Sequence, residues 1–217
     1  MSAATRVRLV RHGEVAAAHH GKFYGGADVP LSEEGARLSV ELAERLALDR
    51  PDLVLSSPLA RARAVADPLA ARCELSVRVE PDLRELDRGS WTHLSTAEVE
   101  ARSPGAVAAY CADPEAGAAP GGEPESALCA RVWPVFDTLA AEFPGASVVA
   151  VAHGHVIRSV LRRLKGWSAP RSLELFVPYH AVVELLLRPD GSGEVVHLPA
   201  GELPEALARA NPSPPDR

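Results

Sequence analysis

Short apolar runs alternate along this chain with longer stretches in which apolar residues recur at helical spacing. An apolar run of a few residues, bounded by turn-forming residues, is typical of a buried β-strand. On this basis, strands are predicted over residues 7–10, 53–57, 75–79, 147–152, 181–187 and 194–198. The sequence PDGSG at 189–193 separates the last two and predicts a hairpin turn.

The intervening stretches predict helices. Leu38, Leu42, Ala43 and Leu46 form an apolar stripe at helical spacing, and Ser32 is placed to cap that helix at its N-terminus. Further helices are expected over 58–72 with Pro58 in the first turn, over 95–111 with a break at Pro104-Gly105, over 125–143 with Pro134 as a kink or a new start, and over 156–165 with Gly166 as the stop. Strands that alternate with helices predict an α/β fold, a three-layer α/β/α sandwich around a mostly parallel central sheet.

Two stretches follow neither pattern. Residues 15–30 are rich in glycine and histidine and predict a loop, and residues 112–124 predict a mobile loop or lid inside an insertion of about 92–124. Because no internal repeat or linker interrupts the pattern, residues 1–199 are expected to form a single domain. The proline-rich residues 200–217 are expected to be a loose C-terminal tail.

Composition narrows the classes of partner. The 217 residues carry a formal net charge of −6, which disfavours nucleic acid as a general partner. The apolar runs are too short to span a membrane, and the few residues before the first strand leave no room for a signal peptide. Cys73, Cys111 and Cys129 are odd in number and widely spaced, so they fit neither a disulfide framework nor a paired-cysteine metal site. We therefore expect a cytoplasmic protein without nucleic-acid or membrane partners.

Two of the predicted buried strands end in a similar way. The first runs into Arg11-His12-Gly13 and the fourth runs into His153-Gly154-His155. Ligands bind at the carboxyl edge of parallel sheets, and neighbouring strands lie about 5 Å apart, so these side chains are expected to share one site. Arginine binds phosphate or carboxylate through two parallel hydrogen bonds, and histidine acts as a base, a nucleophile or a metal ligand.

A third strand ends at Ser56-Ser57-Pro58 and leads to Arg61, close to a helix N-terminus where anions bind well. The sequence alone leaves alternatives open. Taken alone, Arg61 is more typical of a solvated helix surface, and Glu85 is a typical exposed residue of a charged turn. His153 and His155 could form part of a metal site, but no third ligand has a suitable spacing.

Six short motifs follow one another along the chain. They are LVRHGE at 9–14, YGGADVPLSEEG at 24–35, SSPLARARAVA at 56–66, LRELDRGSW at 83–91, PGGE at 120–123 and VAHGHVIR at 151–158. In these motifs and their order the chain resembles the histidine phosphatase superfamily, which has the phosphoglycerate-mutase-like fold. The spelling of residues 24–32 is most similar to the small bacterial phosphatases of the α-ribazole phosphatase type.

The resemblance implies a role for each matched residue. His12 would be the nucleophile that becomes a phosphohistidine, and Glu85 would protonate the leaving group and then activate water. The phosphoryl oxygens would be held by Arg11, Arg61 and His153. The remaining expected substrate-binding residues are Gly13, Gly154, Tyr24 and His93, with no metal and no cofactor. Phosphoryl transfer needs positioning and neutralised charge, which two arginines and a histidine can supply.

Several positions depart from the superfamily pattern. Val15 and Ala18 replace polar residues that mutase-type members use to hold a phosphorylated substrate, which disfavours mutase activity. Other departures are Arg88 in place of an aromatic or apolar residue, His93 in place of glycine, His155 in place of a small residue and Pro124 in place of serine. A rim around the leaving group is expected from His19, His20, Lys22, Tyr24, Arg88, Trp91 and His93.

The predicted function is that of a metal-independent phosphomonoester hydrolase acting through a phosphohistidine. The expected substrate is a small polar phosphorylated metabolite, such as a sugar phosphate, a nucleotide or a cofactor precursor like α-ribazole phosphate. Two alternatives remain: a phosphomutase of the phosphoglycerate-mutase type, and a catalytically silent phosphate-binding module of the same fold. The oligomeric state stays open, with a homodimer as one alternative.

Overall fold

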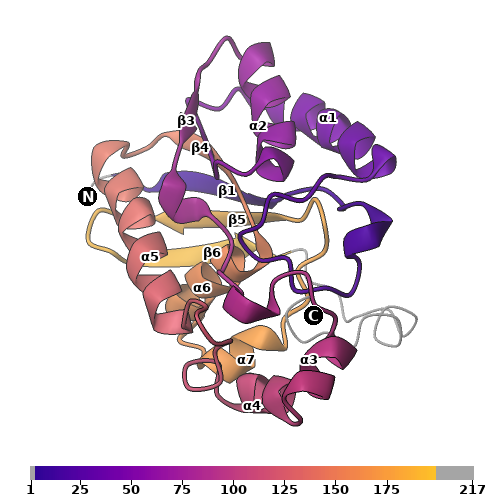
Figure 1. Ribbon diagram of the computed structural model, residues 1–217. Helices are drawn as coiled ribbons and strands as arrows, with labels where there is room; N and C mark the ends of the chain where they lie inside the picture. The colour runs from indigo at the N-terminus through magenta and orange to yellow at the C-terminus, as the bar shows by residue number, and fades with distance from the viewer. Residues whose placement is uncertain (1–2, 199–217) are drawn as a thin grey trace.

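A mixed six-stranded sheet forms the centre of the computed structural model, which describes residues 3–198 (Figure 1). The strands are β1 (Thr5–Arg11), β2 (Leu53–Ser56), β3 (Val77–Val79), β4 (Ser147–Ala152), β5 (Val182–Leu187) and β6 (Gly193–His197). Their order is β3-β2-β4-β1-β5-β6. The first four are parallel, β5 runs antiparallel to β1, and β6 runs antiparallel to β5. The predicted mostly parallel sheet is confirmed, while the expected tail at 200–217 lies outside the described residues.

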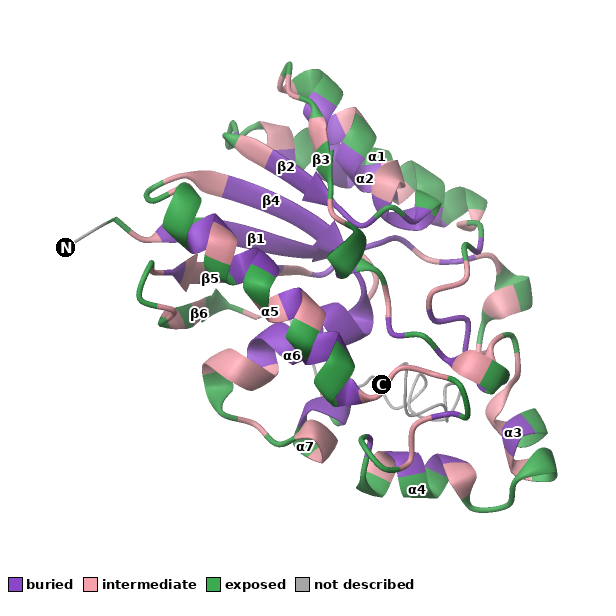
Figure 2. Cartoon of the chain, turned by 60° about the vertical axis from the view of Figure 1, so that its left-hand side comes forward, coloured by how far each residue is buried: buried purple, intermediate pink, exposed green. Residues whose placement is uncertain are grey.

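Helices cover both faces of this sheet. On one face lie α1 (Glu33–Ala47) and α2 (Ala60–Arg72), and on the other lie α5 (Glu125–Glu142) and α6 (Gly154–Lys165) (Figure 1). The central strands are buried along most of their length (Figure 2). The three-layer α/β/α arrangement that the sequence predicts is therefore present.

The alternation of side chains along β4 explains why both faces are apolar. Val149 and Val151 pack in the same cluster as Leu42 of α1, whereas Val148 and Ala150 belong to the cluster on the other side of the sheet. A parallel strand covered on both faces needs such a continuous apolar run. The polar residues that follow β4 therefore emerge abruptly, at the carboxyl edge of the sheet.

Three short helices lie beyond that edge. They are α3 (Thr96–Arg102), α4 (Ala106–Ala112) and α7 (Ala169–Leu173), the last of which the sequence does not predict. The predicted break at Pro104-Gly105 separates α3 from α4, where Gly105 adopts a φ of 82°. A separate apolar cluster built around Phe23, Trp91 and Tyr110 joins this layer to the loop after β1. No helix within residues 3–198 is long and apolar enough to cross a membrane.

The segment that the sequence predicts as a lid is packed against this layer. Ala119 is buried, and the main-chain N–H of Ser90 donates to Pro120 O at 3.0 Å. A Cβ added at Gly117 would lie 2.6 Å from the Cα of Tyr110, so only glycine fits there. Whether residues 92–124 move as a lid stays a prediction.

Several predicted element boundaries are wrong. The second helix begins at Ala60 with Leu59 as its N-cap, and not at Pro58. Pro134 lies inside an unbroken α5, so no new segment starts there. β3 begins only at Val77, because Leu75 N still donates to Ala70 O in the turn that ends α2.

Candidate active site

The carboxyl ends of β1, β4 and β2 meet at one edge of the sheet. Arg11 is in register with Ala152, and His12 N donates to Ala152 O at 3.1 Å. The rings of His12 and His153 consequently lie with their centroids 5.1 Å apart. The expectation that the two strand ends share one site is confirmed in this geometry.

His12 is held in a single tautomer. Its Nδ1 lies 2.7 Å from Gly13 O, and a carbonyl oxygen only accepts, so Nδ1 carries the proton and Nε2 keeps a lone pair. Burial, together with the Arg61 and Arg11 cations, holds the pKa of His12 well below its usual value. His12 therefore presents an unprotonated Nε2 at neutral pH, as a nucleophile requires.

Gly13 makes this arrangement possible. A Cβ at this position would lie 2.6 Å from Ser39 Oγ and 2.7 Å from Gly35 O, both on α1. The end of β1 can approach α1 this closely only without a side chain. Gly13 thus acts through packing, in addition to supplying the carbonyl that fixes His12.

His153 is completely buried beside His12. Its Nε2 lies 2.7 Å from Ser57 Oγ, at the end of β2. Its Nδ1 is buried and has no hydrogen-bond partner in the described part of the chain. Burial, followed by Arg61 and His12, holds the pKa of His153 well below its usual value, so the ring is neutral.

The two arginines are buried and anchored by main-chain carbonyls. Arg11 Nη1 donates to Val177 O, and its guanidinium lies 4.3 Å from the ring centroid of Tyr179. Arg61 donates from Nη1 to Ala27 O and from Nη2 to Gly25 O, each at 2.6 Å. Arg61 Nε is buried without a partner among residues 3–198. The loop after β1 therefore fixes the direction of Arg61.

Glu85 lies opposite, at the first turn of α6. Its carboxylate accepts from Leu86 N at 3.0 Å, and His155 N lies 3.2 and 3.3 Å from its two oxygens. Burial raises the pKa of Glu85, but His155, the Leu86 N–H, Arg61 and Arg88 together outweigh it, and the net pKa is lowered. Glu85 in the ligand-free site is thus a carboxylate held at a helix N-terminus.

Glu85 also borders two openings. One is a narrow pocket lined by Lys22, Phe23, Tyr24, Gly25, Arg88 and His155. The other is wider and is lined by Gly26, Arg84, Asp87, Gly121, Gly122, Glu123 and Arg131. Gly154 lies between the site residues, since a Cβ there would be 3.7 Å from Glu85 Oε2 and 3.8 Å from Arg11 Cζ.

The predicted substrate rim is only partly correct. Trp91 is 5% exposed and packs edge-on against Tyr110 in the apolar cluster, so it does not face the pocket opening. Arg88 is also buried, with Nη2 2.6 Å from His155 Nε2. His93 is exposed and adopts a φ of 69°, which explains why glycine is common at this position of the superfamily. His19 lies beside it, with ring centroids 6.3 Å apart.

Sequence reasoning missed several residues of the site. Ser57 lies in the motif at 56–66, which by itself indicates no role for it, although its hydroxyl contacts His153. Tyr179 and His180 lie just before β5, and no motif marks them. The Tyr179 ring lies 5.7 Å from that of His12, and His180 N donates to His12 O. Only the antiparallel pairing of β5 with β1 brings them here.

Within the described chain, no three or more His, Cys, Asp or Glu side chains are grouped so that they could hold a metal ion. The sequence model of the histidine phosphatase superfamily (branch 1) matches residues 7–198. The chain belongs to the histidine phosphatase superfamily. The resemblance inferred from the six motifs is confirmed, as is the phosphoglycerate-mutase-like fold.

Phosphatases of this superfamily are among the most similar known proteins. Glucosyl-3-phosphoglycerate phosphatase of Mycobacterium tuberculosis is 37% identical over 165 residues, which is 72% of this chain and 74% of that protein. Metal-independent phosphoserine phosphatase of Arabidopsis thaliana is 34% identical over 166 residues, covering 75% and 70% of the two chains. The chain is accordingly a phosphatase of this superfamily.

Solved structures agree. The mycobacterial glucosyl-3-phosphoglycerate phosphatase superimposes with a TM-score of 0.82 at 30% identity, covering 91% of this chain and 100% of that one. A structure described as a putative α-ribazole-5′-phosphate phosphatase from Escherichia coli gives 0.79 at 26% identity, covering 90% and 96%. The superfamily fold thus extends over the described sheet and its flanking helices.

Proposed function

We propose that this superfamily member hydrolyses phosphomonoesters without a metal, through a phosphohistidine formed on His12. The observation that supports this most directly is the bond from Nδ1 of His12 to Gly13 O. It leaves Nε2 unprotonated next to two buried arginines and a neutral His153. A neutral nucleophile beside fixed cations is what attack on a phosphate dianion requires.

In the first step, Nε2 of His12 attacks phosphorus and the bond to the leaving-group oxygen breaks. Arg11 and Arg61 neutralise the charge on the phosphoryl oxygens, with Nε of Arg61 as an unused donor. With the Ser57 hydroxyl donating to Nε2 of His153, Nδ1 of that ring carries a proton for a third oxygen. Glu85 donates its proton to the departing oxygen.

In the second step, water attacks the phosphohistidine from the side that the leaving group has vacated. Glu85, now a carboxylate, takes the proton from this water, and His12 and inorganic phosphate are released. The lowered pKa of Glu85 supports this step, because it favours the carboxylate that acts as the base. The acid form needed in the first step is favoured when a substrate dianion lies nearby and raises the proton affinity of the carboxylate.

The pocket beside Glu85 indicates the class of substrate. Lys22, Tyr24 and Arg88 line it with two cations and an aromatic ring. We propose a small polar leaving group, such as a sugar, a hydroxy acid, a nucleoside or a cofactor precursor. Relatives named for glucosyl-3-phosphoglycerate and for phosphoserine fall within this range.

Two alternatives remain less favoured. A mutase must hold an organic phosphate for the return transfer, but Val15 is fully buried in an apolar cluster with Tyr24 and Val29 and offers that substrate no polar group. A silent binding module needs no proton donor, and yet the carboxylate of Glu85 is held by the main-chain N–H groups of Leu86 and of His155 in α6.

The covalent intermediate provides the test. Wild-type protein quenched after reaction with a ³²P-labelled sugar phosphate is expected to carry an acid-labile, alkali-stable label, and His12→Ala is expected to lose both label and turnover. The panel of substrates should include nucleotides and phosphorylated acids. Turnover that persists in His12→Ala would exclude the mechanism.

A chelation control separates this proposal from a metallohydrolase. Activity in excess EDTA is expected to equal that of untreated protein, because the arginines neutralise the phosphate charge. If chelation abolished activity and added zinc or magnesium restored it, the proposed metal-independent mechanism would be wrong.

A further inference from the structure

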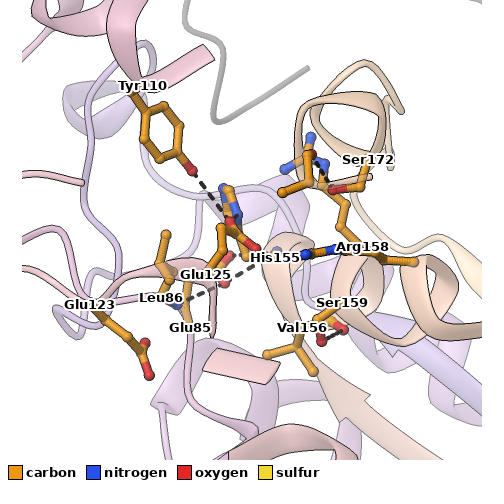
Figure 3. Close-up of polar contacts among 12 residues, drawn as sticks. Glu85, Leu86, Tyr110, Glu123, Glu125, His155, Val156, Arg158, Ser159 and Ser172 are labelled. Carbon is orange, nitrogen blue, oxygen red and sulfur yellow. Dashed lines mark hydrogen bonds and ion pairs between the residues drawn. The ribbon is translucent and has the colours of Figure 1, made fainter. Parts of the chain in front are cut away.

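Behind Glu85 lies a buried cluster of ionisable side chains that take no part in the two chemical steps described above. Its members and their exposed fractions are Arg88 at 3%, Tyr110 at 1%, Glu125 at 2%, His155 at 2% and Arg158 at 2%. Figure 3 shows Tyr110, Glu125 and His155 pointing toward one another from α4, α5 and α6, close to Glu85. Buried charged groups are costly unless they are paired, so such a cluster calls for a physical explanation.

Hydrogen bonding orders three of these side chains into a chain. Arg88 Nη2 lies 2.6 Å from His155 Nε2, and a guanidinium only donates, so Nε2 is the acceptor. The single proton of the neutral ring therefore lies on Nδ1, which is 3.1 Å from Glu125 Oε1. His155 thus links the Arg88 cation to the Glu125 carboxylate.

The same residue contacts the acid of the proposed reaction. The main-chain N–H of His155 faces both oxygens of Glu85, at 3.2 and 3.3 Å. Arg88 lines the narrow pocket together with Glu85. The side chain of His155 is therefore fixed by the cluster while its main chain holds Glu85.

Two of the residues that depart from the superfamily pattern meet here. Arg88 and His155 both depart from the superfamily pattern, and the structure shows that they bond to each other. Because these two side chains are in direct contact, we treat them as a pair. An apolar pair would fill the same space at less electrostatic cost, so packing alone does not account for them.

We propose that Arg88, His155 and Glu125 are positioning residues that hold Glu85 in place and govern how readily it gives up and regains its proton. The inference rests on the proposed function of Glu85. The Arg88 cation favours the carboxylate form of Glu85, and the Glu125 carboxylate offsets part of this effect through His155. The balance of the two keeps Glu85 able to serve as acid and then as base.

Other charged side chains also face Glu85 and Glu125, and the variants used in the experiment below leave them unchanged. Glu85 also faces Arg61 from α2, and Arg11 from β1 approaches it across Gly154. Glu125 also faces Arg158 and Arg162 of α6, as well as Tyr110 of α4. Burial raises the pKa of Glu125 and outweighs the lowering by Arg88, Arg158 and Arg162, so the net pKa is raised.

The test is the pH dependence of kcat for a sugar phosphate, measured from about pH 4 to about pH 8, where the descending limb reports Glu85 in the complex. Arg88→Gln removes a cation and is expected to move this limb to higher pH by roughly half a unit. Glu125→Gln removes an anion and is expected to move it to lower pH by a similar amount. Arg88→Lys keeps the charge and is expected to leave the limb close to that of the wild type.

Matched controls exist on the same two helices. Asp137 of α5 and Arg163 of α6 form an exposed ion pair at 2.9 Å, far along the helices from Glu85. Arg163→Gln and Asp137→Asn change the net charge as the test variants do, and are expected to leave the limb unmoved. Thermal unfolding checks that each variant is folded. If Arg88→Gln does not fold, the direction of the shift in Glu125→Gln decides, because Arg88→Lys keeps the charge.

The outcomes distinguish this inference from the proposed function. If wild-type protein forms the phosphohistidine but Arg88→Gln and Glu125→Gln leave the limb in place, or move it in the same direction, the positioning role is wrong and the function stands. If wild-type protein forms no phosphohistidine, both are wrong. Opposite shifts with unmoved controls support the inference.

Discussion

At the scale of single residues, the site depends on which ring nitrogens carry protons. Nδ1 of His12 is tied to Gly13 O, and Nδ1 of His155 faces Glu125. In both rings the protonated nitrogen is fixed by an acceptor, so the other nitrogen is free to act as a base or an acceptor. His153 differs, because its partner Ser57 is a hydroxyl that can either donate or accept.

The leaving group decides how much Glu85 contributes. Glu85→Gln cannot donate a proton, so kcat/KM for a sugar phosphate is expected to fall by about 10²- to 10⁴-fold. For p-nitrophenyl phosphate, whose leaving group needs little protonation, we expect a fall of only about tenfold. Steady-state kinetics with both substrates measures the difference. Equal losses would indicate that Glu85 serves mainly to orient His12 or water.

The sequence predicts residues that follow strands better than residues joined only by the fold. His12 and His153 directly follow apolar strands, so their position marks them, whereas Arg61 lies in α2 and is singled out only by its motif. Glu125 sits in the first turn of α5 after a run of small residues, where a solvated carboxylate is the usual expectation. Only packing between α4, α5 and α6 buries it, and no local pattern records that packing.

At the scale of elements, the loop after β1 and the start of α2 form one unit. Arg61 donates to Gly25 O and Ala27 O, and Ala60 N donates to Asp28 Oδ1. Gly25 itself adopts a φ of 44°. The loop therefore both closes over α2 and fixes the direction of the Arg61 guanidinium.

Gly25→Ala tests this unit. A Cβ there would lie 2.5 Å from Leu86 O, so the loop must move. We expect a loss of about 1–3 kcal/mol in the free energy of unfolding and a fall in kcat/KM of roughly tenfold or more, because Arg61 loses its anchor. Urea unfolding and steady-state kinetics measure the two effects.

Gly21→Ala is the matched control. Gly21 also has a positive φ, of 67°, but a Cβ there would meet nothing within 4 Å. It is expected to cost only about 1 kcal/mol of stability, with activity retained. Similar losses of activity in both variants would show that backbone strain, and not the anchoring of Arg61, is responsible.

Element boundaries were harder to predict than the elements themselves. Proline at position 58 fits a first helical turn, yet Leu59 takes the N-cap because the turn after β2 extends further. Proline at position 134 is accommodated within α5, and β3 is shortened by the turn that ends α2. Tertiary contacts decide these positions, and they are absent from a local pattern.

At the scale of the whole molecule, the buried histidines make folding sensitive to acid. Burial holds the pKa values of His12, His153 and His155 well below their usual values, so the native state leaves these rings neutral. The unfolded state binds protons on the same rings below about pH 6.5. Stability is therefore full above that pH and is lost as the pH falls below it.

The free energy of unfolding is expected to depend steeply on pH. Each of the three rings contributes up to about 1.4 kcal/mol per pH unit in the window below about pH 6.5. Urea unfolding at a series of pH values from about 7.5 downward measures it. If the free energy of unfolding stays constant or increases as the pH is lowered from about 6.5 to about 5, the rings are not neutral in the native state.

The sheet order explains how the site is assembled during protein synthesis. β1 leaves the ribosome first, yet its two neighbours are β4, at Ser147–Ala152, and β5, at Val182–Leu187. The strand that leads into His12 therefore remains unpaired until most of the chain has been made. Because the antiparallel β5 enters the sheet where β1 leaves it, Tyr179 and His180 reach His12 only in this last stage. A chain released before β5 has been made contains His12, Arg11 and His153 but cannot assemble the surroundings of the nucleophile.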